Sequence, residues 1–90
     1  MSDVFEKVFN KNKELPWQCF DEETIIINPN SQNSFELNEI GSFVWKRLDG
    51  NRSVSQIQDE ICQHYEVSVS EVQEDLGHLL QEMVQQNLIV

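Results

Sequence analysis

The sequence predicts an α+β fold in which a three-stranded antiparallel sheet is followed by three helices. Between residues 15 and 37, apolar residues come in short runs separated by turn residues, as in strands. From residue 38 onward they recur with the 3.6-residue period of helices, and the dipeptide Asp49-Gly50 interrupts that period. A chain of 90 residues has the length of one domain with a modest core.

The first 14 residues are set apart as an N-terminal arm, and the domain is expected to occupy residues 15–90. Val4, Phe5, Val8 and Phe9 are spaced i, i+1, i+4 and i+5, and a polar segment follows them. This spacing fits one or two turns of an amphipathic helix, or an arm that docks loosely on the domain. The residues leave both interpretations open.

Three short strands are expected before residue 38. The segment PWQCF at 16–20 forms the first, and the three consecutive Ile residues of TIIIN favour a buried second strand at Thr24–Asn28. The polar segment NPNSQN at 28–33 is typical of a tight turn, so SFEL at 34–37 returns as the third strand. In such a meander the third strand lies at an edge of the sheet.

Two helices follow the sheet. Asn38 is a good N-cap for a helix over residues 39–48, which ends at Asp49-Gly50. Ser53 and Gln56 have the spacing of a capping box and open a second helix. The inward stripe of this second helix consists of Val54, Ile57, Ile61 and Tyr65.

A third helix precedes the apolar C-terminal residues Leu-Ile-Val. It is capped either by Ser68 with Glu71 or by Ser70 with Gln73, and it runs to about Gln86. Its inward residues are Val72, Leu76, Leu79, Leu80 and Met83. Three strands followed by three helices are typical of a small winged helix-turn-helix domain.

The charge distribution argues against DNA binding, the usual function of that architecture. The chain has a formal net charge of -10, and none of its six basic residues lies beyond position 52. Affinity for DNA comes largely from Lys and Arg side chains that displace counterions from phosphates. A DNA-binding winged helix is therefore the weakest of the functional alternatives.

The two cysteines and the hydropathy indicate the compartment. Cys19 and Cys62 lie far apart and neither belongs to a metal-binding spacing, so we expect two reduced thiols. No segment approaches the roughly 20 apolar residues of a membrane span, and the first residues lack the apolar run of a signal peptide. These features predict a cytoplasmic protein that has no contact with a membrane.

The residues offer little for catalysis. His64 and His78 are the only imidazoles, and neither lies in a catalytic motif. The three glycines are isolated, which excludes a phosphate-binding loop, and the carboxylate pairs resemble solvated helix faces. We predict that the protein is not an enzyme and has no catalytic residue, no metal site and no cofactor.

A family resemblance suggests a function for this fold. The residues that carry it are Leu37-Asn38-Glu39, Trp45, Leu48-Asp49-Gly50, Ser53-Val54 and Ile57. With this pattern the chain resembles, over about residues 17–90, the PqqD family. That family is named after coenzyme PQQ synthesis protein D and includes the stand-alone recognition proteins of lasso-peptide pathways. The motif is mostly scaffold, and the resemblance does not extend to the arm.

The resemblance implies a chaperone for a precursor peptide. Family members bind the leader segment of a ribosomally synthesised, post-translationally modified peptide (RiPP) as RiPP recognition elements. They present it to a modifying enzyme, such as a radical-SAM protein or a leader protease. The leader adds as a strand to the third strand and lies between that strand and the third helix. The residues expected to bind the peptide are Ser34, Phe35, Glu36, Leu37, Gln73, Leu76, Gly77, Leu80 and Val84.

The helical wheel of the third helix suggests where leader side chains would be held. Its apolar face is wider than core packing requires, and the excess lies on the side of Leu80 and Val84. Gly77 lies beside them, where its missing side chain would admit a peptide backbone. With Phe35 and Leu37 these residues would form an apolar slot. Alternatively, the wide face only packs against the C-terminal Leu-Ile-Val.

Other side chains near the helices leave alternatives. Asp75 and Glu82, on the opposite margin of the third helix, would suit a basic leader residue. Trp45 is expected to pack between the first helix and the sheet, or else to contact the leader or the enzyme. Arg47 and Arg52 either take an acidic leader residue or only add charge to the surface.

The edge strand SFEL also allows a function of another class, because a free strand edge can pair with a second copy of the chain. The protein would then be a structural or oligomerisation subunit of a biosynthetic complex. The resemblance identifies neither the precursor peptide nor the enzyme, and PQQ and lasso-type pathways fit equally well.

Overall fold

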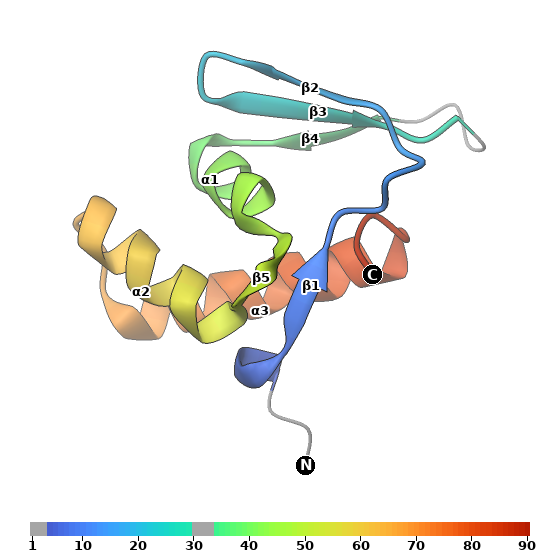
Figure 1. The fold of residues 1–90 in the computed structure, drawn as a ribbon. Coiled ribbons are helices and arrows are strands. Elements are labelled where there is room, and N and C mark those ends of the chain that lie inside the picture. The colour runs from blue at the N-terminus through green and yellow to red at the C-terminus, as the bar shows by residue number, and fades with distance from the viewer. Residues whose placement is uncertain (1–3, 30–33) are drawn as a thin grey trace.

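Residues 4–29 and 34–90 are described by a computed structural model, in which helices cover one face of a three-stranded sheet (Figure 1). The strands β2 (Trp17–Phe20), β3 (Glu23–Ile27) and β4 (Ser34–Leu37) pair antiparallel in the order β2-β3-β4. The helices are α1 (Glu39–Arg47), α2 (Val54–His64) and α3 (Val69–Gln85). The predicted α+β order of three strands and three helices is confirmed. Most of the turn expected at 28–33 lies outside the described residues.

Local sequence signals explain where the helices begin. Asn38 caps α1 through its side-chain oxygen. Ser53 caps α2 in a full capping box, because its hydroxyl accepts the Gln56 backbone N–H and the Gln56 side chain accepts the Ser53 N–H. α3 follows Ser68, whose hydroxyl accepts the Glu71 N–H at 3.3 Å. The first of the two predicted caps of this helix is therefore the one that forms.

The structure contains a second, two-stranded sheet that was not predicted from the sequence. β1 (Val8–Asn10) pairs antiparallel with β5 (Asp49–Ser53), which connects α1 to α2. Asp49-Gly50 ends the first helix as predicted, but the chain then continues as a strand. The segment DGNRS has low β-propensity and its partner lies far upstream, so no local signal marks this pairing.

The N-terminal arm is a docked strand rather than an amphipathic helix. Only the short 3-10 turn η1 (Val4–Glu6) precedes β1. Phe9 packs against the core, and Asn10 exchanges backbone hydrogen bonds of 3.0 and 2.9 Å with Val90. The arm thus joins the C-terminal residues to the β5 connection, and its helical part is limited to the single 3-10 turn at Val4–Glu6.

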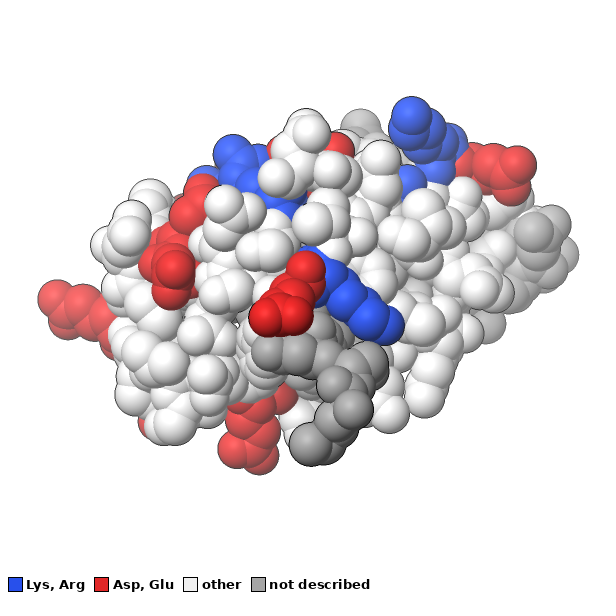
Figure 2. All heavy atoms as spheres, turned by 60° about the horizontal axis from the view of Figure 1, so that its bottom comes forward, with Lys and Arg blue, Asp and Glu red and all other residues white. Residues whose placement is uncertain are grey.

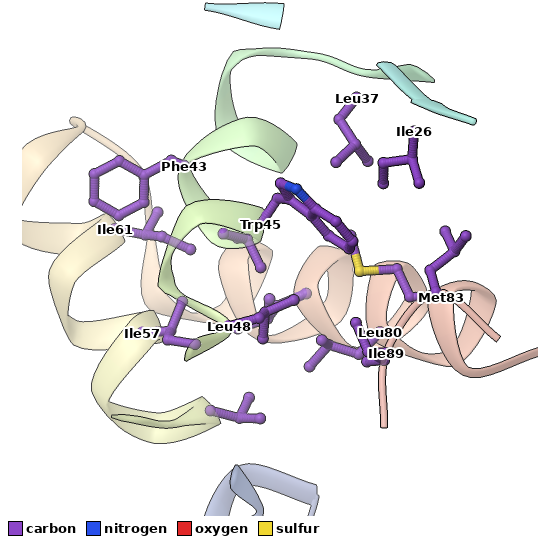
Figure 3. Close-up of a cluster of buried hydrophobic side chains, with 14 of the residues drawn as sticks. Ile26, Leu37, Phe43, Trp45, Leu48, Ile57, Ile61, Leu80, Met83 and Ile89 are labelled. Carbon is purple, nitrogen blue, oxygen red and sulfur yellow. The ribbon is translucent and has the colours of Figure 1, made fainter. Parts of the chain in front are cut away.

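Trp45 lies at the centre of the core, with Ile26 and Leu37 on the sheet side and Met83 of α3 opposite (Figure 3). Its side chain is fully buried, and its ring stands edge-on to Trp17 with the ring centroids 6.0 Å apart. The packing interpretation of Trp45 is therefore confirmed. A contact with a peptide or an enzyme would need exposed atoms that this residue does not have.

A buried pair of hydroxyl groups ties the sheet to α1. Thr24 Oγ1 donates to Ser42 Oγ at 2.7 Å, and Ser42 Oγ donates to the Leu37 carbonyl at 3.4 Å. Both hydroxyl side chains are buried. Because Leu37 is the last residue of β4, these hydrogen bonds hold the end of that strand against α1.

The cysteines and the length of the helices can be compared with the expectations from the sequence. Cys19 and Cys62 are free, so neither is used in a disulfide. Within the described residues, the helices are too short or too polar for any of them to traverse a lipid bilayer. The expectation of two unpaired thiols is thus confirmed.

Candidate functional site

A groove lies between the edge strand β4 and α3. β4 pairs with β3 on one side, and no strand within the described residues pairs with its other side. The groove has a volume of about 540 Å3, in the range of ligand-binding pockets. Its walls are β4 with the start of α1 on one side and α3 on the other, and Ile61 and Val67 close it.

The floor of the groove is aliphatic. Leu37 and Val44 line it from β4 and α1, and Val72, Leu76 and Leu79 line it from α3. The three α3 residues are spaced i, i+4 and i+7, which places them on one side of the helix. Leu79 is only half-buried, whereas the other four side chains are buried. An apolar side chain inserted into the groove would therefore meet a preformed aliphatic surface.

The rim of the groove is acidic. Glu71, Asp75 and Glu82 line it from α3, and none of the described residues that line it is Lys or Arg. On a helical wheel the three α3 carboxylates lie within about 40° of one another, so they form one row along the helix. Every ion pair among the described residues uses carboxylates elsewhere in the chain. The rim thus presents negative charge without a basic partner in the groove lining.

The structure divides the predicted binding residues into two groups. Those that line the groove are Ser34, Phe35, Glu36, Leu37 and Leu76. Those that lie outside it are Gln73, Gly77, Leu80 and Val84. The residues predicted from the strand come together with one residue of the helix, and the rest of the predicted helix residues face elsewhere.

The predicted apolar slot does not form, because the groove opens at the other margin of α3. Leu80 is only 1% exposed and belongs to the core, whereas Val84 is 47% exposed. A Cβ added to Gly77 would meet no atom within 4 Å, so this position borders open space. Leu79, assigned to the core stripe by the sequence, lines the groove instead. The wheel identifies the apolar face of α3, but its packing against α2 and the C-terminal residues decides which margin faces the sheet.

Further residues of the groove were not singled out from the sequence as binding residues. They include Ile40, Val44, Val67, Glu71, Val72 and Leu79. One signal was present, since the carboxylates of α3 recur on the same side of the helix as Leu79. A row of carboxylates next to an apolar residue is expected where the apolar floor of a groove meets its exposed rim.

Arg47 and Arg52 are used within the protein and do not line the groove. Arg47 Nε donates to Glu60 Oε1 at 3.1 Å, and its guanidinium carbon lies 3.4 Å from the centroid of the Phe43 ring. Arg52 Nε lies 3.1 Å from Glu60 Oε2, and its Nη1 pairs with Asp49. The two arginines therefore connect α1 and β5 to α2, and they are not placed to bind an acidic ligand residue in the groove.

The groove contains no group suited to acid–base catalysis by an imidazole or a thiol. His64 and His78 are exposed and neither lines it. Across residues 4–29 and 34–90, no cluster of His, Cys, Asp and Glu has the composition of a metal site. Burial lowers the pKa of Lys11 and raises the pKa of Tyr65, but both residues lie outside the groove. The arrangement is suited to binding by shape, apolar contact and charge.

Comparison with known proteins identifies the family and a similar fold. The family model for coenzyme PQQ synthesis protein D (PqqD) matches residues 23–89. A solved structure of TbiB1 in complex with the TbiA(beta) leader peptide is similar in fold, with a TM-score of 0.79 and 24% sequence identity. That similarity covers 89% of this chain and 93% of the other. No curated protein matches the chain. Because the family model matches most of its length, the chain belongs to the PqqD family.

Proposed function

We propose that this protein binds the leader segment of a RiPP precursor by strand addition to β4 and presents it to a modifying enzyme. The observation that carries the proposal is the free edge of β4 beside an apolar groove. An edge strand is a template for an extended peptide, whose backbone hydrogen bonds give affinity while side-chain pockets give specificity. The groove provides such a pocket next to the template.

The family membership supports the proposal, since the match includes β4, α1, α2 and α3. The structure of TbiB1 adds support of another kind, because that protein has the same fold and holds a leader peptide. The leader of the present protein would accordingly lie along β4 and over the groove. The enzyme that receives it would be a radical-SAM protein or a leader protease of a PQQ, lasso or other RiPP pathway.

The energetics make the groove decisive for affinity. Four or five backbone hydrogen bonds contribute a net ~1 kcal/mol each, and one or two buried apolar anchors contribute ~2 kcal/mol each. Ordering the leader costs ~1 kcal/mol or more per residue. Because these contributions nearly cancel, the side chains that enter the groove determine whether the peptide binds.

The protein itself would perform no chemical step. Holding the leader beside the enzyme makes their encounter effectively intramolecular and raises the local substrate concentration to the millimolar range. Exposed carboxylates outside the groove, such as Asp59 of α2 and Glu74 of α3, would remain free for a basic face of the enzyme, with an attraction that weakens as salt rises. This role requires neither a cofactor nor a metal.

A titration of a leader peptide tests the proposal. The precursor is sought in the neighbouring reading frames, and its synthetic leader is added to isotope-labelled protein. Backbone amide shifts are expected at Ser34–Leu37 and along the groove side of α3. Leu79→Ala should weaken binding roughly tenfold because it removes part of the apolar floor. Val84→Ala, on the exposed outer side of α3, is the matched control and should leave the affinity unchanged.

Two results would contradict the proposal. Shifts confined to β2 would place the peptide at the other edge of the sheet, and equal losses in the two variants would separate binding from the groove. Sedimentation without peptide tests the alternative role of an oligomerisation subunit. A dimer that persists when leader is added would favour that role, because self-pairing would occupy the same edge.

A further inference from the structure

We infer that the peptide recognised by this groove carries Lys or Arg on both sides of an apolar anchor, on the strand face that turns towards α3. This inference rests on the proposed function and names the chemical class of its ligand. It is carried by the charge of the groove lining, in which three carboxylates of α3 run beside an aliphatic floor and, among the described residues, no basic side chain is present.

The carboxylates of α3 are concentrated at the groove rather than spread over the helix. Glu71, Asp75 and Glu82 line the groove, and only Glu74 among the acidic residues of α3 does not. The helix contains no Lys or Arg that could neutralise the row. Glu36 of β4 also lines the groove, but its side chain alternates with that of the buried Leu37 and turns to the other face of the sheet. The groove would repel an acidic peptide. A basic peptide would instead reduce the repulsion among the carboxylates of the groove.

The spacing of the row suits an extended peptide. The helix rises by about 6 Å from Glu71 to Asp75 and by about 10.5 Å from Asp75 to Glu82. Side chains on one face of a strand repeat about every 6.6–6.8 Å. A strand that follows α3 therefore passes two or three same-face side chains along the row.

The order of residues along α3 places the anchor between the cations. Leu76 and Leu79 of the floor lie between Asp75 and Glu82 in the sequence, and all four line the groove. A peptide side chain opposite the two leucines thus has carboxylates near both of its same-face neighbours. Lys and Arg fit these neighbouring positions, because their apolar stems cover the floor while their charged ends reach the rim. The expected ligand pattern is a basic residue, an apolar residue and a basic residue at alternate positions.

A pair of double variants with the same change in charge tests this inference. Asp75→Asn/Glu82→Gln removes the two rim charges on either side of Leu76 and Leu79, and Asp59→Asn/Glu74→Gln neutralises two exposed carboxylates outside the groove. Each double variant removes one Asp and one Glu charge without a large change in shape. A phage-displayed library of random peptides is selected against the unmodified protein and against both variants. The leader of the natural precursor is not needed for this experiment.

The unmodified protein and the control double variant should enrich peptides with Lys or Arg two positions from an apolar residue. The rim variant should still enrich apolar strands but lose the basic preference. For one enriched peptide, measured by fluorescence anisotropy, the rim variant should bind about tenfold more weakly at about 50 mM salt. This difference should shrink to about twofold at roughly 0.5 M salt because ions screen exposed charge pairs.

The outcomes separate this inference from the proposed function. Enriched peptides that shift groove amides in NMR spectra but show no basic preference would overturn the inference and leave strand addition intact. Equal losses in both double variants would assign the effect to net charge and would also overturn it. Peptides whose shifts fall outside β4 and α3 would instead contradict the proposed function. Asp75→Lys/Glu82→Lys provides a positive test, since it should select acidic peptides in place of basic ones.

Discussion

Two regions of this protein use charge in opposite ways. The support region, formed by β5, α2, Lys11 and Arg47, engages its basic side chains internally. Arg47 at the end of α1 and Arg52 both reach Glu60, and Lys11 Nζ lies 5.9 and 5.8 Å from the ring centroids of Trp17 and Trp45. The groove region, formed by β4 and the groove-lining side of α3, presents the three carboxylates of α3 and, within the described part of the chain, no basic side chain.

The position of each charged side chain therefore says more about its role in this protein than the net charge of -10 does. The basic side chains that stabilise the support region are not available to the groove. Figure 2 shows that, on the face with α2, the arm and α3, carboxylates gather mostly towards α2, while large areas are uncharged. We expect substitutions in the support region and the core to change stability, and substitutions in the groove region to change peptide binding.

The largest expected effect is on the core that both regions share. Trp45→Ala should lower the free energy of unfolding by about 3–5 kcal/mol, since the indole is fully buried between the sheet and α3. Urea unfolding followed by far-UV circular dichroism measures this loss. Val84→Ala is the surface control and should change the free energy of unfolding by less than about 0.5 kcal/mol. A loss below about 1 kcal/mol for Trp45→Ala would contradict the central position of this residue.

A second prediction concerns the hydroxyl pair that connects the core to the groove. Ser42→Ala leaves the buried Thr24 hydroxyl without its 2.7 Å partner and should cost about 1–3 kcal/mol of unfolding free energy. The double variant Thr24→Val/Ser42→Ala should cost less than the sum of the single variants, because both polar groups are then absent. Additive costs would contradict this coupling. Ser42→Ala should also weaken leader binding, since Ser42 holds the end of β4 through Leu37.

The sequence predicts the frame of the site because the relevant signals are local. Asn38, Ser53 and Ser68 cap their helices through residues three positions away, so the caps can be recognised without a structure. The edge position of SFEL follows from three short strands in succession. These local signals place the edge strand β4 and the start of α3, whereas the groove between them was expected from the resemblance to the PqqD family.

The rest of the site depends on contacts between distant parts of the chain. The pairing of β1 with β5 cannot be predicted from the sequence, because neither segment has the alternation or the composition of a strand. The helical wheel cannot choose between the Leu79 and Leu80 margins of α3, since both are apolar. Leu80 is drawn into the core, and this packing turns Leu79 and the carboxylate row towards β4.

A third prediction sharpens the difference between the two margins of α3. Gly77→Ala should raise the free energy of unfolding by up to about 1 kcal/mol, because alanine favours the helix and its Cβ would meet no atom within 4 Å. Leader affinity should not change. Gly41→Ala is the opposing control, because its Cβ would lie 3.1 Å from Leu37 Cβ and this crowding should offset the gain in helix propensity, so that alanine stabilises position 41 less than position 77. Weaker leader binding by Gly77→Ala would indicate that the peptide lies along the Leu80 and Val84 margin of α3, as the helical wheel suggested.

The smallest expected effect is the pH dependence that one carboxylate of the support region contributes. The backbone N–H of Asn51 donates to Asp49 at 3.0 Å, and this hydrogen bond, with a smaller contribution from Arg52, lowers the pKa of Asp49 below its ordinary value of 3.8. The unfolded chain therefore takes up this proton at a higher pH than the folded chain does. The stability that ionised Asp49 contributes is complete above that ordinary value, and it disappears as the pH falls through the lowered pKa.

Asp49→Asn should consequently make the loss of stability below about pH 4 less steep, while the amide oxygen can still accept the Asn51 N–H. Urea unfolding at a series of acidic pH values measures the slope. Arg52→Gln should reduce the slope by a smaller amount, because the hydrogen bond from Asn51 contributes more to the shift than the charge of Arg52 does. A slope that Asp49→Asn leaves unchanged would show that the carboxylate adds nothing to the support region. The internal use of charge would then be limited to the contacts of Glu60 and Lys11.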